Sequence, residues 1–258
     1  MNFDADTQPL HLLERLIEVQ ASDCQASFTA GLPAIQRWLQ NAAAQHAESL
    51  GVGIQALQQQ NLTWMLSRIS VSVIRPIPCG ETIRLLTWPS GVRGKLVAER
   101  QFHLETLTGE PLLNGSSEWL CVNLTTGRLA PLPEAVKQLA TPTTLAFRLC
   151  QDKLPAPSPN VTPLQSLPLT VYRQQIDANR HVNNVHYTEW AQETLPEDFY
   201  FNHHPVAFNI EFKHAAQLGD SIISETYALT SNTFCHHILA QTGTILARAT
   251  THYPSTIS

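Results

Sequence analysis

The chain has 258 residues, of which 43% are hydrophobic and 14% charged, and this composition predicts a globular protein with a substantial core. The formal net charge of −5 gives no general attraction for nucleic acid or an anionic membrane, so we expect no nucleic-acid partner. The five cysteines form no C-x-x-C pair, the N-terminal residues lack a secretory pattern, and no apolar run could span a bilayer, so we expect a cytoplasmic protein with reduced thiols and no membrane span.

The first half predicts one long helix followed by strands. Apolar residues recur at helical spacing from Leu32 to Leu50, and Gly51 ends the run, so we expect a helix buried against a sheet. An apolar stretch precedes the helix at His11–Val19. Extended or alternating apolar runs then predict strands at Leu62–Ile74, Glu81–Trp88, Val97–Thr106 and Ser116–Val122. One long helix followed by several strands is an α+β pattern.

Eight prolines between Pro131 and Pro168 mark this segment as a linker, apart from a short helical stretch at Glu134–Leu139. The predicted units are therefore residues 1–130, a proline-rich linker over 131–168, and residues 169–258. The second unit repeats the order of the first. A strand near 169–173 leads to a helix after Asn183 and then to strands at Pro205–Lys213, Ser221–Leu229, Phe234–Ala240 and Ile245–Tyr253.

Two short matches between the halves indicate an internal repeat. Cys79–Ile83 matches Leu218–Ile222 at an offset of 139. Thr108-Gly109 matches Thr242-Gly243 at an offset of 134, in the same chain order. We therefore expect two halves that share one fold.

A third match shows how the halves differ. It begins at Asp23, at an offset of 154, and places Gln25 and Ser27 opposite Asn179 and His181. The first half then has no imidazole that could take a proton at neutral pH. We expect the chemistry only in the second half, and a binding surface in the first.

The stretch from residue 177 to residue 193 combines a carboxylate, amides and imidazoles with the start of a helix. Asp177, Asn179 and His181 occupy alternate positions, so in an extended chain their side chains would point to one side. Either Asn183 or Asn184 could cap the helix that follows. A helix start presents unpaired N–H donors and a positive dipole end, and these can hold a developing oxyanion.

The helix itself has a predicted face. Tyr187, Trp190 and Glu193 recur at three-residue spacing, which suits one side of a helix.

This stretch resembles the signature of the acyl-acyl-carrier-protein thioesterases, enzymes that end fatty acid synthesis. Their pattern D-x-N-x-H-V-N-N-x-x-Y-x-x-W-x-x-E is matched from Asp177 to Glu193. In the first half, Ala44–Gly51 is similar to the family's first helix, and Trp64–Arg68 to its W-x-L-S-R strand. The resemblance implies a double hot-dog fold, in which each of two tandem repeats wraps an antiparallel sheet around its own central helix.

The implied reaction is hydrolysis of an acyl thioester, giving a free fatty acid and the thiol of an acyl carrier protein. The resemblance assigns catalytic roles to Asp177, Asn179 and His181. We expect N–H groups around His181–Asn184 to polarise the carbonyl and His181 to deprotonate or orient water. Asn179 would position water or substrate, and Asp177 would hold the group in place. No cofactor is implied, and the histidine pairs lack metal-site spacing, so we expect no metal.

The sequence departs from this family on the strand after the helix. The family usually carries a catalytic glutamate there, in a pattern like Y-K-K-E, where Ala215 ends the run F-K-H-A. Glu211 and Gln217 are near enough in sequence to substitute for it. Two alternatives stay open: a catalytically weakened acyl-binding hot-dog protein, and an acyl-CoA thioesterase. A hot-dog dehydratase would normally show an H-F-P-G-like turn, which this sequence lacks.

The acyl chain needs an apolar tunnel, which the resemblance places between the helix and sheet of the first half. Our candidate lining residues are Trp38, Ala42, Ala43, Trp64 and Leu66. The carrier protein of this pathway is acidic, so we expect it to dock on a local basic cluster, for which the candidates are Arg173, Arg180 and Lys213. Assembly into a homodimer, beyond the internal pair, stays open.

Overall fold

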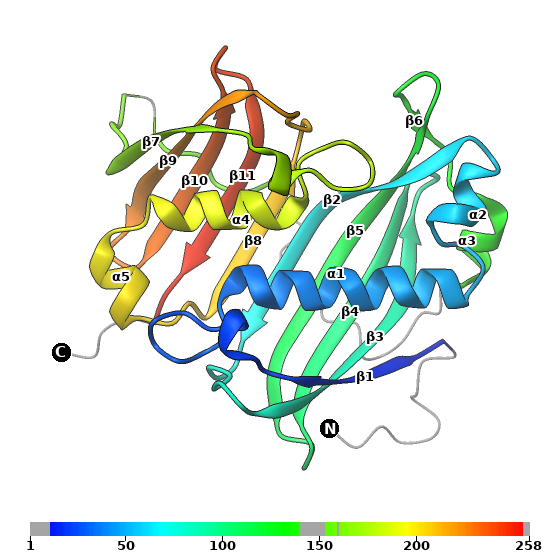
Figure 1. The fold of residues 1–258 in the computed structure, drawn as a ribbon, viewed down its shortest axis with the longest axis horizontal. Coiled ribbons are helices and arrows are strands. Elements are labelled where there is room, and N and C mark those ends of the chain that lie inside the picture. Colours follow the sequence, from blue (N-terminus) through cyan, green and yellow to red (C-terminus); the bar gives the residue numbers. More distant parts are fainter. Residues whose placement is uncertain (1–10, 140–152, 159, 255–258) are drawn as a thin grey trace.

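The computed structural model describes residues 11–139, 153–158 and 160–254, and within them the strands join into one antiparallel sheet (Figure 1). The sheet has eleven strands, in the order β1-β3-β4-β5-β2-β8-β11-β10-β9-β7, with β6 beside β5. Two central helices, α1 and α4, cover one face of this sheet (Figure 1). The described helices include none that is long and apolar enough to cross a membrane.

The N-terminal half follows the predicted order. Its elements are β1 (Leu13–Glu18), α1 (Leu32–Ser49), α2 (Ile54–Gln58), β2 (Leu62–Val73), β3 (Thr82–Arg93), β4 (Val97–Thr106), β5 (Pro111–Asn123), β6 (Leu129–Ala130) and α3 (Glu134–Leu139). Pro33 lies in the first turn of α1, where no backbone donor is needed, and Gly51 follows its end with φ 72°. The apolar stripe of α1 is buried against the sheet, as predicted.

The C-terminal half contains β7 (Gln165–Thr170), α4 (Asn184–Glu193), α5 (Glu197–Asn202), β8 (Ala207–Phe212), β9 (Ser221–Thr230), β10 (Thr233–Ala240) and β11 (Ile245–His252). Its central helix has 10 residues against 18 in α1. The first strand starts at Gln165, inside the segment predicted as a linker. Pro168 is tolerated in this strand because β7 lies at the edge of the described sheet, next to β9.

The two half-sheets are joined along β2 and β8, where Ser70 lies opposite Asn209. Their offset is 139 (209 − 70), the same value that separates Cys79 from Leu218. Equivalent residues of the two halves therefore meet at this junction, as at an isologous interface. The sequence predicted two sheets, and the pairing of β2 with β8 makes them one.

The two central helices also contact each other. Thr188 of α4 donates a hydrogen bond to Gln36 of α1, and both side chains are buried. A continuous apolar core extends through both halves and includes Leu39 and Ile69 from the first, and Tyr187 and Ile210 from the second. The loop before α4 is thus fixed next to the junction of the halves.

Candidate active site

The predicted site residues lie in a closed loop before α4. An isolated bridge joins Ile176 to Val182, and the Asp177 N–H donates to the His181 carbonyl at 2.9 Å. Arg180 has φ 63°, and its N–H donates to the Asp177 carbonyl at 3.0 Å. The expectation of an extended chain with these three side chains on one side is therefore wrong, because a turn reverses the chain between Asp177 and His181.

The Asp177 carboxylate holds this loop through the backbone. Its Oδ1 accepts a hydrogen bond from the Asn179 N–H at 2.8 Å and a longer one from the His181 N–H at 3.4 Å. Asp177 is half-buried, whereas the side chains of Asn179 and His181 are exposed. The loop thus brings the three residues into one turn and leaves an amide and an imidazole accessible to water.

The start of α4 leaves one backbone donor of this stretch unused. Asn183 is the helix cap, since its Oδ1 accepts from the Val185 N–H at 3.1 Å. The Val182 N–H donates to the Ala216 carbonyl and the Asn183 N–H to the Gln175 carbonyl. Within the described part of the chain, the Asn184 N–H has no hydrogen bond. Of the expected oxyanion donors, the N–H groups of His181, Val182 and Asn183 are occupied and that of Asn184 is available.

Ala215, which stands where the family usually carries a catalytic glutamate, lies next to this loop. Ala216 accepts from the Val182 N–H at 3.0 Å, and its own N–H donates to the Tyr187 hydroxyl at 2.8 Å. Burial raises the pKa of Tyr187 to about 12, so this hydroxyl stays neutral. Ala215 directly precedes this anchor and is exposed. An acidic side chain at residue 215 would therefore start next to the loop.

Glu211 is engaged elsewhere. Its carboxylate pairs with Arg68 of β2 and with Lys213 Nζ at 2.7 Å, and its side chain is only 6% exposed. This ion pair crosses the junction of the two halves, so the side chain stabilises the joined sheet. Gln217 is exposed in a turn, where its N–H donates to Asp220 Oδ2 at 2.8 Å.

The predicted face of α4 is confirmed for two of its three residues. Tyr187 and Trp190 are buried, and their rings pack edge to face at 5.1 Å. Glu193 is exposed at the end of the helix instead. A pair missed from the sequence lies nearby, where His186 Nδ1 and Glu189 Oε2 are 2.6 Å apart on the exposed side of α4.

A loop of the same geometry occurs in the first half. Cys24 bridges Ala30, the Gln25 N–H donates to the Thr29 carbonyl at 2.9 Å, and Phe28 has φ 56°. Each of these features recurs 152 residues later, in the loop that contains Arg180.

The repeat offset of 154 in this loop is therefore wrong by two residues. Gln25 is equivalent to Asp177, and the positions of Asn179 and His181 hold Ser27 and Thr29. The error came from matching two aspartates, whereas the loops share backbone geometry and little sequence. The first half still has no imidazole at this place.

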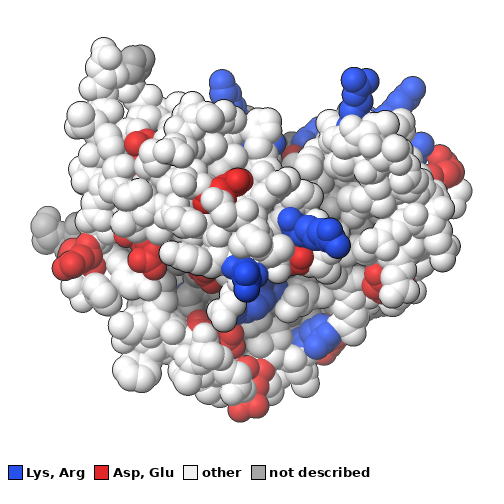
Figure 2. Space-filling view, turned by 45° about the horizontal axis from the view of Figure 1, so that its top comes forward, with Lys and Arg blue, Asp and Glu red and all other residues white. Residues whose placement is uncertain are grey.

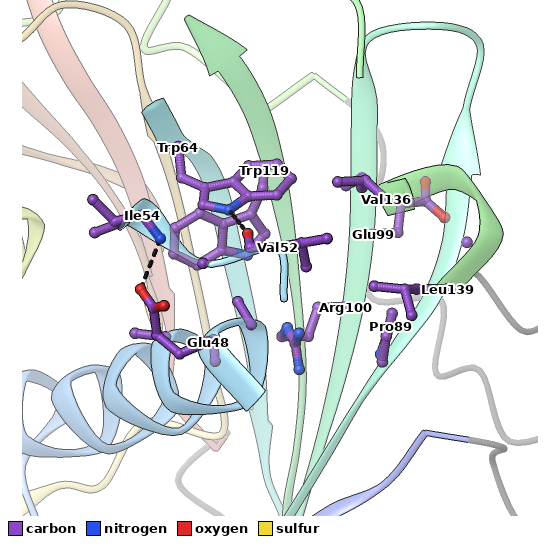
Figure 3. A pocket seen from close by; sticks show the side chains of 16 residues that line it. Glu48, Val52, Ile54, Trp64, Pro89, Glu99, Arg100, Trp119, Val136 and Leu139 are labelled. Carbon is purple, nitrogen blue, oxygen red and sulfur yellow. Dashed lines mark hydrogen bonds between the residues drawn. The ribbon is translucent and has the colours of Figure 1, made fainter. Parts of the chain in front are cut away.

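A mainly apolar cavity of about 100 Å³ lies in the first half, between α1, the sheet and α3 (Figure 3). Of the five residues expected to line an acyl tunnel, Ala43 and Trp64 border it. Trp38 and Ala42 belong to the main core, and Leu66 is buried outside the cavity lining.

The sequence missed most of the cavity lining. Trp119 packs edge to face against Trp64 with ring centroids 6.4 Å apart, and Trp64 Nε1 donates to the Val52 carbonyl (Figure 3). Val136 and Leu139 of α3 border the opposite side. The sequence predicted α3 but assigned it to the linker, and its two apolar residues at three-residue spacing were the signal that it packs.

Exposed cations do not form one continuous band on the face that Figure 2 shows, where blue groups are separated by white surface. Arg173 is exposed and precedes the site loop, Arg180 is exposed within it, and Lys213 is 48% exposed beside Glu211. Docking on these three residues stays a prediction. Within residues 11–139, 153–158 and 160–254, no group of three His, Cys, Asp or Glu is placed to hold a metal ion.

Comparison with known proteins links this geometry to one family. Residues 12–139 match the family model described as the acyl-ACP thioesterase N-terminal domain, and residues 160–255 match the C-terminal domain. A dodecanoyl-[acyl-carrier-protein] hydrolase of Cinnamomum camphora is 24% identical over 94% of this chain and 67% of its own length. A palmitoyl-acyl carrier protein thioesterase of Gossypium hirsutum is 28% identical over 83% of this chain and 54% of its length. The chain thus spans about half to two thirds of these relatives.

Solved structures agree on the fold. The 12:0-ACP thioesterase from Umbellularia californica has a TM-score of 0.84 at 22% identity, covering 94% of this chain and 97% of its own. An acyl-ACP thioesterase from Bacteroides thetaiotaomicron has a TM-score of 0.81 at 20% identity, covering 95% and 98%. The double hot-dog fold is confirmed.

Proposed function

The chain belongs to the acyl-ACP thioesterase family, and from that premise we propose that it hydrolyses the thioester between a fatty acyl chain and acyl carrier protein (ACP). The products would be the free fatty acid and the carrier thiol. The observation that carries this proposal is the Asp177 loop, which presents an exposed imidazole and amide next to an unused N–H at the start of α4.

We assign the steps to these groups. The Asn184 N–H polarises the thioester carbonyl and stabilises its oxyanion. His181 takes a proton from water as the water oxygen bonds to the carbonyl carbon. The C–S bond then breaks, and the protonated His181 gives this proton to the carrier sulfur as it leaves. Asn179 positions water or substrate, and Asp177 holds the loop that carries both side chains.

The acyl chain would extend from this site into the cavity of the first half. That cavity lies along the C-terminal part of α1, and α1 contacts α4 through Gln36. Its lining is predominantly apolar, as methylene groups require.

An acyl-binding protein with weakened turnover is the second candidate, and Ala215 favours it because the position that precedes the loop anchor Ala216 carries no acid. An acyl-CoA thioesterase is the third. One assay separates them: acyl-ACP and acyl-CoA thioesters are supplied in parallel, and free thiol and free acid are measured. Faster thiol release from acyl-ACP supports our proposal, and faster release from acyl-CoA supports the CoA enzyme. Tight binding without product supports the binding protein, and an enoyl product would indicate a dehydratase. Cytoplasmic location and homodimer formation stay predictions.

A further inference from the structure

Arg100 of β4 is a buried cation at the wall of the apolar cavity. Only 8% of this residue is exposed. Its Nη1 donates to His46 Nδ1 at 3.0 Å and to Thr87 Oγ1 at 3.1 Å. Figure 3 shows Arg100 between the end of α1 and Pro89, on the same cavity as Trp64 and Val136.

Both partners of Arg100 are uncharged. Burial and the Arg100 cation lower the pKa of His46 to about 4, so His46 is neutral at pH 7 and accepts the hydrogen bond. Burial lowers the pKa of Arg100 to about 10, which leaves the guanidinium protonated. The cation is therefore buried without a compensating negative charge from either contact.

The two carboxylates that border the cavity are used by other groups. Glu48 Oε1 accepts from the Ile54 N–H at 2.8 Å, and Glu99 Oε1 pairs with Arg93 at 3.3 Å. Among the residues that the structure describes, no carboxylate lies within ion-pair distance of Arg100. A buried guanidinium of this kind is costly unless an acceptor, above all an anion, pairs with it.

A purely apolar chain end would leave this cost in place. A carboxylate would remove it, because guanidinium and carboxylate form two parallel charge-assisted hydrogen bonds. The remaining wall, with Ala43, Ala47, Trp64 and Trp119, suits the methylene groups that lead to such an end.

We propose that the cavity receives acyl chains with a carboxylate at the end remote from the thioester, and that Arg100 binds this carboxylate. This inference rests on the proposed function and specifies its substrate class, the half-thioesters of dicarboxylic acids. Arg100 here determines specificity and takes no part in the chemistry at the loop.

The first test compares hydrolysis of two ACP thioesters of equal chain length, one ending in a methyl group and one in a carboxylate. The wild-type chain should favour the carboxylate-ended substrate in kcat/KM by at least about tenfold. Arg100→Met should remove this preference, so that the variant hydrolyses the two substrates with similar kcat/KM. Arg128→Met is the matched control, because Arg128 is exposed and lies outside the cavity lining, and it should keep the preference.

The second test measures binding without turnover. Quenching of tryptophan fluorescence reports cavity binding, since Trp64 and Trp119 line it. The monomethyl ester of a long dicarboxylic acid should bind wild type at least about tenfold more tightly than the dimethyl ester. This comparison needs no variant, so it tests whether the cavity binds a terminal carboxylate even if Arg100→Met does not fold.

Equal binding of the two esters, or equal hydrolysis of the two thioesters by wild type, would overturn the inference. In the latter case hydrolysis of acyl-ACP would still stand. Carboxylate-selective binding with no hydrolysis of any thioester would support the cavity assignment and contradict the proposed function.

Discussion

Thr188 of α4 donates a hydrogen bond to Gln36 of α1, and the two residues occupy equivalent positions in the two halves, 152 residues apart. Both are buried, at 0% and 2% exposure. Thr188→Val should lower the free energy of unfolding by about 1–3 kcal/mol, because it leaves the Gln36 amide oxygen without a donor. Urea unfolding measures this change.

The matched double variant sharpens this prediction. Gln36→Leu with Thr188→Val removes donor and acceptor together, so it should be more stable than Thr188→Val alone. If the double variant loses as much free energy of unfolding as the two single variants together, the hydrogen bond adds nothing to the stability of the junction.

The ion pair between Arg68 and Glu211 should matter for stability and not for catalysis. Glu211→Gln removes the Glu211 charge from the Arg68 side chain, which is 12% exposed, and should lower the free energy of unfolding by about 3 kcal/mol. Lys213→Met is the control, since Lys213 is 48% exposed and should cost less than about 1 kcal/mol. Thermal unfolding and kcat per folded molecule are measured together. If folded Glu211→Gln loses kcat, Glu211 acts in catalysis in place of the family glutamate that is absent at residue 215.

Ala215→Glu should increase activity. The residue is exposed and precedes Ala216, which anchors the loop through Val182, so a carboxylate there would lie beside the reacting groups. General acid–base assistance predicts a rise in kcat/KM of at least about tenfold on acyl-ACP. The control His214→Glu places a carboxylate one residue away and should change kcat/KM little. An equal response to both variants would indicate a charge effect and not a positioned acid.

Elements with strong periodicity could be predicted from the sequence. The strand Val97–Thr106 and the helix Glu134–Leu139 have the predicted bounds, and α1 ends one residue earlier than predicted. These segments are specified by local apolar patterns, which a sequence shows directly. The pairing of Ser70 with Asn209 could not be predicted in this way, because neither residue indicates which strand of the other half it will face.

The site was predicted in part. The sequence indicated that Asp177, Asn179 and His181 belong to one site before the helix, but it did not predict the turn that they form. That turn depends on the left-handed backbone of Arg180, and arginine gives no sign of this conformation. The cavity combines Trp64, Trp119 and Val136, which approach one another only through tertiary packing. Such non-local contacts are not encoded in any one stretch of sequence.

Acid should destabilise the protein through His236. This side chain is fully buried between Thr226 and Thr251, at 2.7 and 2.9 Å, and burial lowers its pKa from 6.5 to about 3. Between pH 6.5 and 3 the unfolded chain binds one proton more than the folded chain does. The free energy of unfolding should therefore fall by about 1.4 kcal/mol per pH unit from this group as the pH decreases.

His236→Gln removes that titration and should have a flatter stability profile below pH 6.5, with no difference in slope above it. Urea unfolding across this range gives both profiles. Parallel profiles for wild type and variant would show that His236 is protonated in the folded chain.

The central claim is that the exposed imidazole of His181 handles the proton in thioester hydrolysis, and its removal tests this most directly. His181→Ala should reduce kcat/KM on acyl-ACP by at least about a hundredfold. Its unfolding midpoint should stay unchanged, since the Asp177 carboxylate bonds to the backbone of residue 181 and not to its side chain. His252→Ala, at an exposed histidine of β11, should keep the full rate. A folded His181→Ala protein that hydrolyses acyl-ACP as fast as the wild-type chain would contradict the account.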